Sequence, residues 1–400
     1  MTLITKLSEL TGAKKNALSV LLIAAIAFII YSNTFDASFH FDDTPSIVEN
    51  YAIHRFDIKQ IFSGSTRPVL DLTFAVNYYF GKLDVFGYHL VNLLLHIANG
   101  VMLYFILMWT MQRNEEQRVK GSVQAVMSSA MSQEPGAKSY YSRIPLYASL
   151  IFIAHPVQTQ AVTYIVSRSS VLATFFYLLT FVLFIKAIRS RNSMPYFACA
   201  FVSACLGMGT KQEAATLPVM LMLYDYYFLS DGKLDGLKKY FRFHLAISAS
   251  LLVVFYLSMS NLQMFVSFDY SKGVSMPQGE SITSFQYFLT QLNVIPYYIR
   301  LLFVPANLNL DYDWPITRHI DFMTAFYSLL LLSIVVLAVW LFRRQRLISF
   351  GIIWFFVTLT VTSSFVVIYD VIFEHRLYLP SIGFALVLSV FISKITRIKS

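Results

Sequence analysis

The chain has 400 residues, of which 56% are hydrophobic and only 13% are charged. Soluble globular proteins carry about 25% charged residues, so the composition excludes an ordinary soluble enzyme, and the 36 Phe and 25 Tyr exclude a disordered chain. The net charge of +9 points either to a nucleic-acid partner or to basic loops on one side of a membrane.

Ten runs of mainly apolar residues predict membrane helices, because about 20 such residues span a bilayer. The first run is expected to be an anchor and not a cleaved signal peptide. A further stretch, 285–304, contains Pro296 and Arg300 and is expected to be a re-entrant or interfacial helix on the outer side. The ten predicted spans are 17–32, 87–111, 144–163, 169–187, 195–210, 214–230, 244–262, 322–342, 347–367 and 380–394.

The positions of the charges predict the orientation of these spans. With the N-terminus in the cytoplasm, 21 of the 31 Lys and Arg lie on the inner side and 15 of the 22 Asp and Glu on the outer side. This is the positive-inside pattern. It predicts that both termini are cytoplasmic, and it explains the net charge without a nucleic-acid partner.

The spans organise residues 1–400 into one all-α integral membrane domain. Two large outer segments, 33–86 and 263–321, contain almost every residue that could carry chemistry, while the polar inner loop 112–143 is expected to be flexible. The run after Arg67 predicts a helix lying along the outer interface. Phosphate-loop, dinucleotide-binding and serine-hydrolase elbow motifs are absent from the sequence.

Two adjacent carboxylates, Asp42 and Asp43, follow the first span. Neighbouring like charges raise one pKa, which suits a general base near neutral pH, and the pair could also hold a divalent cation such as Mg²⁺ or Mn²⁺. No histidine spacing typical of a metal site supports ligands from His. The alternative is a solvated pair that caps a helix at Thr44, although the nearby Phe39 and Phe41 favour burial of this segment.

Several cations lie at the outer ends of spans, where the positive-inside rule depletes them. Arginine matches the oxygens of a phosphate, so these residues predict a site for an anionic lipid headgroup. The alternative is that they pair with neighbouring carboxylates and only stabilise the bundle. The candidates are Arg67, Arg168, Lys211, His375 and Arg376.

A second group of outer residues is expected to contact an acceptor or a sugar. Asp313 and Trp314 combine a carboxylate with an aromatic ring, although an ordinary turn before a proline is an equal alternative. The whole group is His155, Glu213, Asp313, Trp314 and Glu374.

Six blocks of the sequence together resemble a known membrane family, the transmembrane and tetratricopeptide-repeat O-mannosyltransferases and their bacterial relatives, within the GT-C glycosyltransferases. The blocks include N-x-F…F-x-F-D-D, H-P-V-Q-T-Q-A-V and E-H-R-L-Y-L-P. In order they are Asn33–Asp43, Arg67–Phe74, Gly87–His96, His155–Arg168, Lys211–Asp225 and Glu374–Pro380.

The resemblance implies a GT-C-type bundle of about ten transmembrane helices with outer interfacial helices. It implies transfer of a sugar such as mannose from a polyprenyl-phosphate donor on the non-cytoplasmic face, in a bacterial inner membrane. Asp42 and Asp43 would then be catalytic: one deprotonates an acceptor hydroxyl, which displaces the lipid phosphate with inversion. The basic residues would hold the leaving phosphate, most firmly Arg376.

The sequence departs from that family in two ways, which leave other functions open. The chain ends at Ser400 without tetratricopeptide repeats, and Gln212 separates Lys211 from Glu213. The missing repeats weaken the expectation of a protein acceptor, and the alternatives are a lipid-linked glycan, a cell-surface polymer or a protein bound by a separate partner. The alternatives are a transporter or flippase, which nearly charge-free spans disfavour, and an envelope scaffold, in which the outer carboxylates and arginines would not converge.

Overall fold

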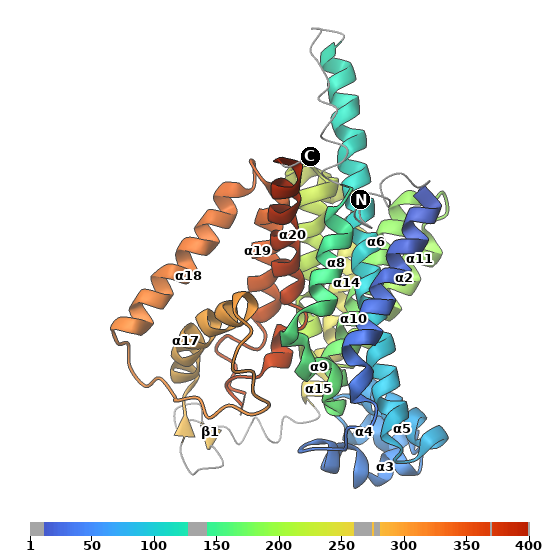
Figure 1. Cartoon of the computed structure of the whole chain (residues 1–400), viewed down its shortest axis with the longest axis vertical. Helices are drawn as coiled ribbons and strands as arrows, with labels where there is room; N and C mark the ends of the chain where they lie inside the picture. The colour runs from blue at the N-terminus through green and yellow to red at the C-terminus, as the bar shows by residue number, and fades with distance from the viewer. Residues whose placement is uncertain (1–11, 127–141, 260–273, 276–280, 369, 399–400) are drawn as a thin grey trace.

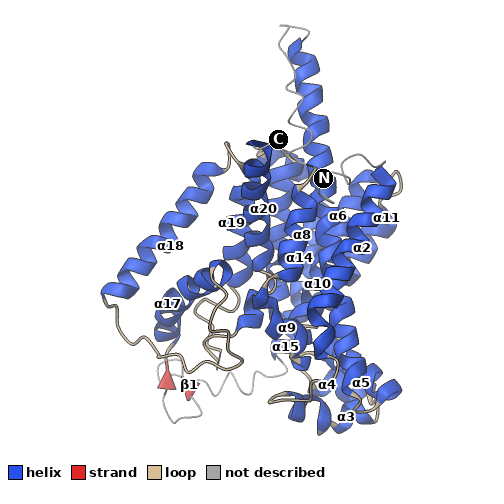
Figure 2. Ribbon diagram, in the orientation of Figure 1, coloured by secondary structure: helices blue, strands red, loops and turns tan. Residues whose placement is uncertain are grey.

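The computed structural model describes residues 12–126, 142–259, 274–275, 281–368 and 370–398. Over these residues the chain is almost entirely helical, as expected (Figures 1 and 2). The exception is one pair of two-residue antiparallel strands, β1 (Val274–Ser275) and β2 (Ser281–Ile282), in which Val274 faces Ile282. The all-α expectation is confirmed. The rest of 263–280 lies outside the described residues.

Five helices in the described ranges are long and apolar enough to cross a membrane, and four shorter helices are also apolar. They confirm an integral membrane protein, while the number of ten spans stays a prediction. The five candidates are Gly12–Thr34, Val85–Arg113, Ile165–Arg189, Leu234–Leu257 and Phe322–Leu341. The shorter ones are Ile144–Ala154, Met194–Met208, Arg346–Leu359 and Ser381–Thr396.

The helices of the bundle run roughly along one axis, and a cap of short helices closes one end (Figure 1). The bundle helices are α2 (Gly12–Tyr31), α6 (Val85–Val126), α8 (Ile144–Ala154), α10 (Arg168–Arg189), α11 (Met194–Met208), α12 (Leu217–Tyr224), α14 (Phe241–Ala249), α15 (Leu251–Met259), α18 (Phe322–Leu341), α19 (Arg346–Leu359) and α20 (Ser381–Ile398). The cap helices are α3 (Tyr51–His54), α4 (Ile58–Gly64) and α5 (Pro68–Gly81).

Shorter elements complete the chain. Helix α17 (Ser284–Phe303) begins with a capping box at Thr283 and continues through Pro296; it is not among the candidate spans, and its interfacial position stays a prediction. The remaining elements are α9 (Thr159–Thr163), α13 (Leu234–Leu237), the π-helical turns η2 (Thr44–Val48) and η6 (Asp225–Leu229), and the 3-10 turns η1 (Ser32–Thr34), η3 (Pro156–Gln158), η4 (Ile165–Ser167), η5 (Gln212–Thr216), η7 (Lys238–Tyr240) and η8 (Glu374–Leu377).

Three expected spans are not continuous helices. The span 144–163 breaks after α8 at His155 and Pro156, because proline lacks the N–H that would continue the helix. The described part of 244–262 breaks at Ser250, and 347–367 stops being helical after Leu359.

The inner loop expected at 112–143 also differs in its first half. Helix α6 continues to Val126, because residues 112–126 are rich in good helix formers such as Gln, Glu, Arg and Lys. Residues 127–141 lie outside the described part of the chain.

The core of the bundle is built around α6, α8, α10, α19 and α20, whose buried apolar side chains form one continuous cluster. Helices α19 and α20 approach most closely at two glycines: a Cβ on Gly383 would lie 2.2 Å from the carbonyl oxygen of Gly351. Small residues permit such contact between membrane helices. Helix α18 stands apart from this core (Figure 1), and much of its apolar surface is exposed.

Candidate active site

The two adjacent carboxylates of the first loop lie in different surroundings. Asp43 is only 1% exposed, and its two oxygens accept backbone N–H groups from Val166 (2.7 Å) and His40 (3.0 Å). It makes no capping bond to the following turn η2. Asp42 has an exposed side chain, and its backbone N–H donates to the Tyr164 hydroxyl at 2.9 Å. Asp43 therefore fastens the loop, while Asp42 presents its carboxylate.

Burial, more than the neighbouring charge, sets the acidity of Asp43. Burial raises its pKa to about 6, against the lowering effect of the two backbone N–H groups, and the charge of Asp42 adds a smaller rise. The shift has the direction expected from an Asp-Asp pair. Its main cause is the packing of the loop against the turn at Val166.

A buried lysine lies across the site from this loop. Lys211 is 6% exposed; its Nζ lies 2.6 Å from Oε1 of Glu213 and donates to Oγ of Ser170 at 2.7 Å. Burial lowers the pKa of Lys211 to about 8; Glu213 opposes this, while the charges of Arg67 and Arg376 lower the pKa further.

Two arginines lie within electrostatic reach of Lys211. Arg376 is 4% exposed and donates to the backbone carbonyls of Val371 (3.2 Å) and Asp370. Arg67 precedes α5, and burial lowers its pKa, with Arg376 adding to the effect and Glu213, Asp71 and Asp42 opposing it. We call Arg67, Lys211 and Arg376 the cation cluster.

The turn that carries Lys211 is joined directly to the start of α5. The N–H of Val69 donates to the carbonyl of Gly209 at 3.2 Å. A Cβ on Gly209 would lie 2.9 Å from Cγ2 of Val69, so this close approach depends on glycine. The contact explains how Arg67 and Lys211, far apart in the sequence, come together.

His375 adjoins the cation cluster but is not a cation itself. Its ring stacks on Phe373 with 4.9 Å between ring centroids, and its backbone N–H donates to Oε1 of Gln160 at 2.6 Å. Burial and the charges of the cation cluster hold the pKa of His375 well below its ordinary value. The neutral ring can donate or accept a hydrogen bond, but it adds no positive charge at neutral pH.

Arg168 is fully buried and is engaged on every side by α5 and α6. Its guanidinium donates to the side-chain oxygens of Asn92 (2.6 Å), Asn77 (2.6 Å) and Thr73 (3.2 Å) and to the carbonyl of Tyr88 (2.9 Å). These contacts fasten the helix that follows Arg67 to the bundle. The geometry gives Arg168 a positioning role and does not bring it into the cation cluster.

The residues expected to contact an acceptor or a sugar are mostly engaged within the protein. Nε2 of His155 lies 2.9 Å from the carbonyl of Leu302 at the end of α17. Glu374 accepts the N–H of Asn309 at 2.6 Å and the hydroxyl of Tyr312, and burial raises its pKa. Glu374 thus holds the segment 304–321 against η8, and His155 contacts the end of α17.

Asp313 and Trp314 lie on that same segment. Asp313 is exposed, and the Trp314 ring packs against Tyr297 of α17 with 5.0 Å between centroids. Contact of either residue with an acceptor stays a prediction.

Two residues of the site were not found from the sequence. Tyr164, which accepts the N–H of Asp42, lies between two of the recognised sequence positions, His155 and Arg168. Asp370 precedes Glu374 by four residues in a segment that reads as the end of an apolar span. No local motif marks either residue; only the fold brings them to Asp42.

Several known proteins have sequences related to this chain. This chain is similar in sequence to protein O-mannosyl-transferases. One from Caenorhabditis elegans is 24% identical over 412 residues, covering 96% of this chain and 53% of the relative. One from Drosophila melanogaster is 27% identical over 54% of this chain and 24% of its own length, and a human one is 27% identical over 51% and 29%.

The resemblance to O-mannosyltransferases is therefore confirmed. No family model matches the chain. The chain spans from about a quarter to about half the length of these curated transferases. A bacterial origin and the absence of tetratricopeptide repeats stay expectations.

A metal site finds little support in the side chains. Among the described residues, no group of three or more His, Cys, Asp and Glu side chains is arranged to hold a metal ion. Both oxygens of Asp43 already accept N–H groups, so Asp42 is the member of the pair whose carboxylate is open to an ion. A divalent cation at Asp42 and Asp43 stays a prediction.

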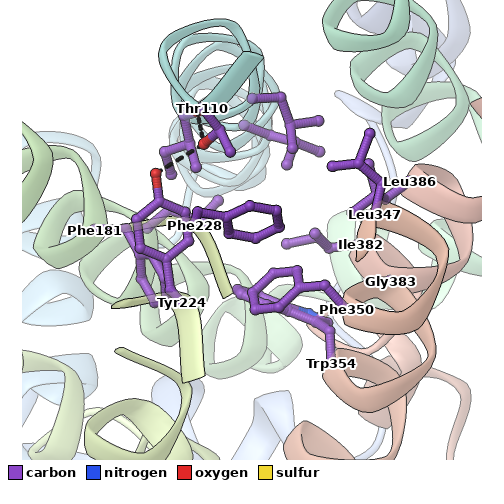
Figure 3. A pocket seen from close by; sticks show the side chains of 14 residues that line it. Thr110, Phe181, Tyr224, Phe228, Leu347, Phe350, Trp354, Ile382, Gly383 and Leu386 are labelled. Carbon is purple, nitrogen blue, oxygen red and sulfur yellow. Dashed lines mark hydrogen bonds between the residues drawn. The ribbon is translucent and has the colours of Figure 1, made fainter. Parts of the chain in front are cut away.

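A separate apolar cavity lies inside the bundle, among α6, α10, α19 and α20 (Figure 3). Its polar feature is the pair formed by Thr110 and Tyr224, whose hydroxyl oxygens lie 2.8 Å apart. The cavity measures about 30 Å³, which suits water-sized groups and is too small for a sugar. The candidate site is therefore the charged group around Asp42 and the cation cluster.

Proposed function

We propose that this chain is a membrane glycosyltransferase that moves a sugar from a polyprenyl-phosphate donor to an acceptor hydroxyl on the non-cytoplasmic face. The observation that carries the proposal is the cation cluster of Arg67, Lys211 and Arg376 beside the exposed carboxylate of Asp42. The names of the relatives support mannose as the sugar and a protein as the acceptor.

The charge balance of the cluster favours an anionic ligand. Burying a charge is costly unless it is paired, and among the described residues the carboxylate in direct contact with the cluster is Glu213, on Lys211. Arg67 and Arg376 retain charge for an added anion. A phosphate fits because guanidinium groups bind its oxygens in pairs.

The proposed reaction is a single displacement. Asp42 takes the proton of the acceptor hydroxyl as that oxygen forms a bond to the anomeric carbon. The bond from this carbon to the phosphate oxygen breaks, and its electron pair leaves with polyprenyl phosphate. The cation cluster stabilises the charge that grows on the phosphate. The products are an inverted glycoside and polyprenyl phosphate, with the proton on Asp42.

Two neighbouring residues hold the elements that carry Asp42 and Arg67 in position. Asp43 holds the loop that carries Asp42 through its bonds to Val166 and His40. Arg168 fastens α5 behind Arg67. The convergence of carboxylate and cations supports an enzyme over a scaffold, for which no convergence is expected.

The test is a transfer assay on membranes that contain the chain, with radiolabelled polyprenyl-phosphate mannose and an acceptor peptide rich in Ser and Thr or a glycan acceptor. Asp42→Asn should lower transfer by about 10²–10⁴-fold, the usual contribution of a general base. The control is Asp36→Asn, an exposed carboxylate earlier in the same loop, which should keep full activity. Full activity of Asp42→Asn at equal expression would refute the proposal.

A further inference from the structure

The segment before η8 holds one exposed carboxylate on a firmly fixed backbone. The guanidinium of Arg376 donates to the carbonyls of Asp370 and Val371, and Nε2 of Gln291 donates to the same Val371 carbonyl at 2.8 Å. Further along, Phe373 exchanges two 3.0 Å hydrogen bonds with the Tyr298 hydroxyl. Asp370 itself is exposed. Its carboxylate is thus accessible, and the backbone that follows it is held by hydrogen bonds at Val371 and Phe373.

Asp370 lies close to Arg376 and within electrostatic reach of Asp42. Arg376 lowers its pKa, while burial and the charges of Asp311 and Asp42 raise it, so its carboxylate is within electrostatic reach of both a phosphate-binding cation and the proposed base. The guanidinium of Arg376 also contacts the backbone carbonyl of Asp370 directly.

Tyr164 completes the same side of the site. Its hydroxyl accepts the N–H of Asp42 at 2.9 Å, which leaves its own O–H to donate. Its pKa is raised first by burial and then by the charges of Asp42, Asp43 and Asp370. A carboxylate acceptor and a hydroxyl donor therefore both lie near Asp42.

A sugar undergoing displacement must occupy the space next to Asp42. Its anomeric carbon lies between the attacking oxygen, at Asp42, and the leaving phosphate, at Arg376. Its ring hydroxyls then point toward groups beside this line. A carboxylate accepts hydrogen bonds from two neighbouring hydroxyls at once. The buried carboxylates nearby are already engaged: Asp43 by N–H groups, Glu213 by Lys211 and Glu374 by Tyr312.

We propose that Asp370, assisted by Tyr164, binds ring hydroxyls of the transferred sugar and makes the enzyme selective for their stereochemistry. This inference rests on the proposed function. A site built to bind a hydroxyl discriminates strongly against an analogue that lacks it or presents it on the other face of the ring.

The test compares polyprenyl-phosphate mannose with its glucose epimer and with mono-deoxymannose donors, measuring kcat and KM for each variant. Asp370→Asn should raise KM for the mannose donor by about tenfold or more and reduce the preference for mannose over glucose. The penalty that the wild type shows for one deoxy donor should disappear in Asp370→Asn. Tyr164→Phe should act in the same direction, and Asp36→Asn should change nothing.

The possible results distinguish a failure of the sugar-binding role from a failure of the proposed transferase activity. Absence of transfer by the wild type contradicts the proposed function. Transfer by the wild type, with unchanged KM and unchanged sugar preference in Asp370→Asn, contradicts only the sugar-binding role, and so does a loss of kcat alone. If Asp370→Asn does not fold, Asp370→Glu keeps the charge one methylene further out; an altered sugar preference supports the role, and an unaltered one contradicts it.

Discussion

At the scale of single residues, Asp42 and Asp43 have the same type of side chain but different surroundings. Asp43 is buried and hydrogen-bonded, whereas Asp42 is exposed. The sequence identifies the pair as a candidate, because two carboxylates beside a membrane span need a reason to be there. It could not divide the work between them. That division depends on the N–H of Val166, 123 residues away, which reaches Asp43 and leaves Asp42 exposed.

The division predicts different effects of the same substitution at the two positions. Asp43→Asn turns one carboxylate oxygen into an NH₂ group that faces a backbone N–H, which should cost about 1–3 kcal/mol and lower the thermal unfolding temperature in detergent. Asp42→Asn, at an exposed side chain, should leave that temperature unchanged while lowering transfer by about 10²–10⁴-fold. Equal unfolding temperatures for both variants would contradict the anchoring role of Asp43.

Lys211 predicts the alkaline limit of activity. Its pKa of about 8 means that the ammonium charge is present below pH 8 and is lost as the pH rises through that value. The kcat/KM for the donor, which reports the free enzyme, should therefore fall above about pH 8.

Lys211→Arg provides the matched control, because a guanidinium keeps its proton throughout this range. The variant should move the alkaline fall of kcat/KM upward in pH, whatever its absolute rate. An identical pH profile in wild type and variant would exclude Lys211 as the titrating group.

At the scale of elements, the cap helix α5 is held by one buried arginine. Four hydrogen bonds from Arg168 to α5 and α6 set the position of the helix that begins just after Arg67. The ammonium group of a lysine has three N–H donors and lacks the planar, forked shape of a guanidinium. A lysine at this position therefore cannot replace the four hydrogen bonds.

Arg168→Lys should therefore lower both stability and transfer. Breaking one side of a buried charged network costs about 3–5 kcal/mol, and a displaced α5 carries Arg67 away from the phosphate. The control is Arg189→Lys at the far end of the same helix, where the exposed arginine donates to the Trp109 carbonyl. Unfolding temperature and donor KM are the readouts; indistinguishable values for the two variants would remove the positioning role.

Hydropathy located the helices better than it located their ends. Each predicted span overlaps described helix, but 347–367 continues as apolar sequence beyond the end of α19 at Leu359. That irregular apolar stretch leads into the segment that contains Asp370 and receives Arg376. Hydropathy cannot distinguish an apolar helix from an apolar stretch of irregular chain, and part of this stretch is exposed.

At the scale of the whole molecule, the distribution of charge predicts which end faces the cytoplasm. Asp36 and the Arg343-Arg344-Gln345-Arg346 cluster lie on opposite sides in the predicted topology. In a background without Cys199 and Cys205, Asp36→Cys should react with a membrane-impermeant maleimide on intact cells. Arg343→Cys should react only after permeabilisation, and the reverse pattern would overturn the orientation.

The candidate residues stand out one by one in the sequence, but their proximity in the fold does not. Charged residues at span ends are conspicuous in an apolar sequence, so Arg67, Lys211 and Arg376 were identified individually. Their association depends on contacts such as the one from Val69 to Gly209, for which the sequence has no local signal. The same limit explains why Arg168 was grouped with the phosphate-binding candidates.

The most direct measurement is a structure of the Asp42→Asn variant in lipid with intact polyprenyl-phosphate mannose bound. The account predicts the phosphate in contact with Arg67, Lys211 and Arg376, and the anomeric carbon facing residue 42. A phosphate bound away from these three cations, or a sugar facing away from residue 42, would contradict it.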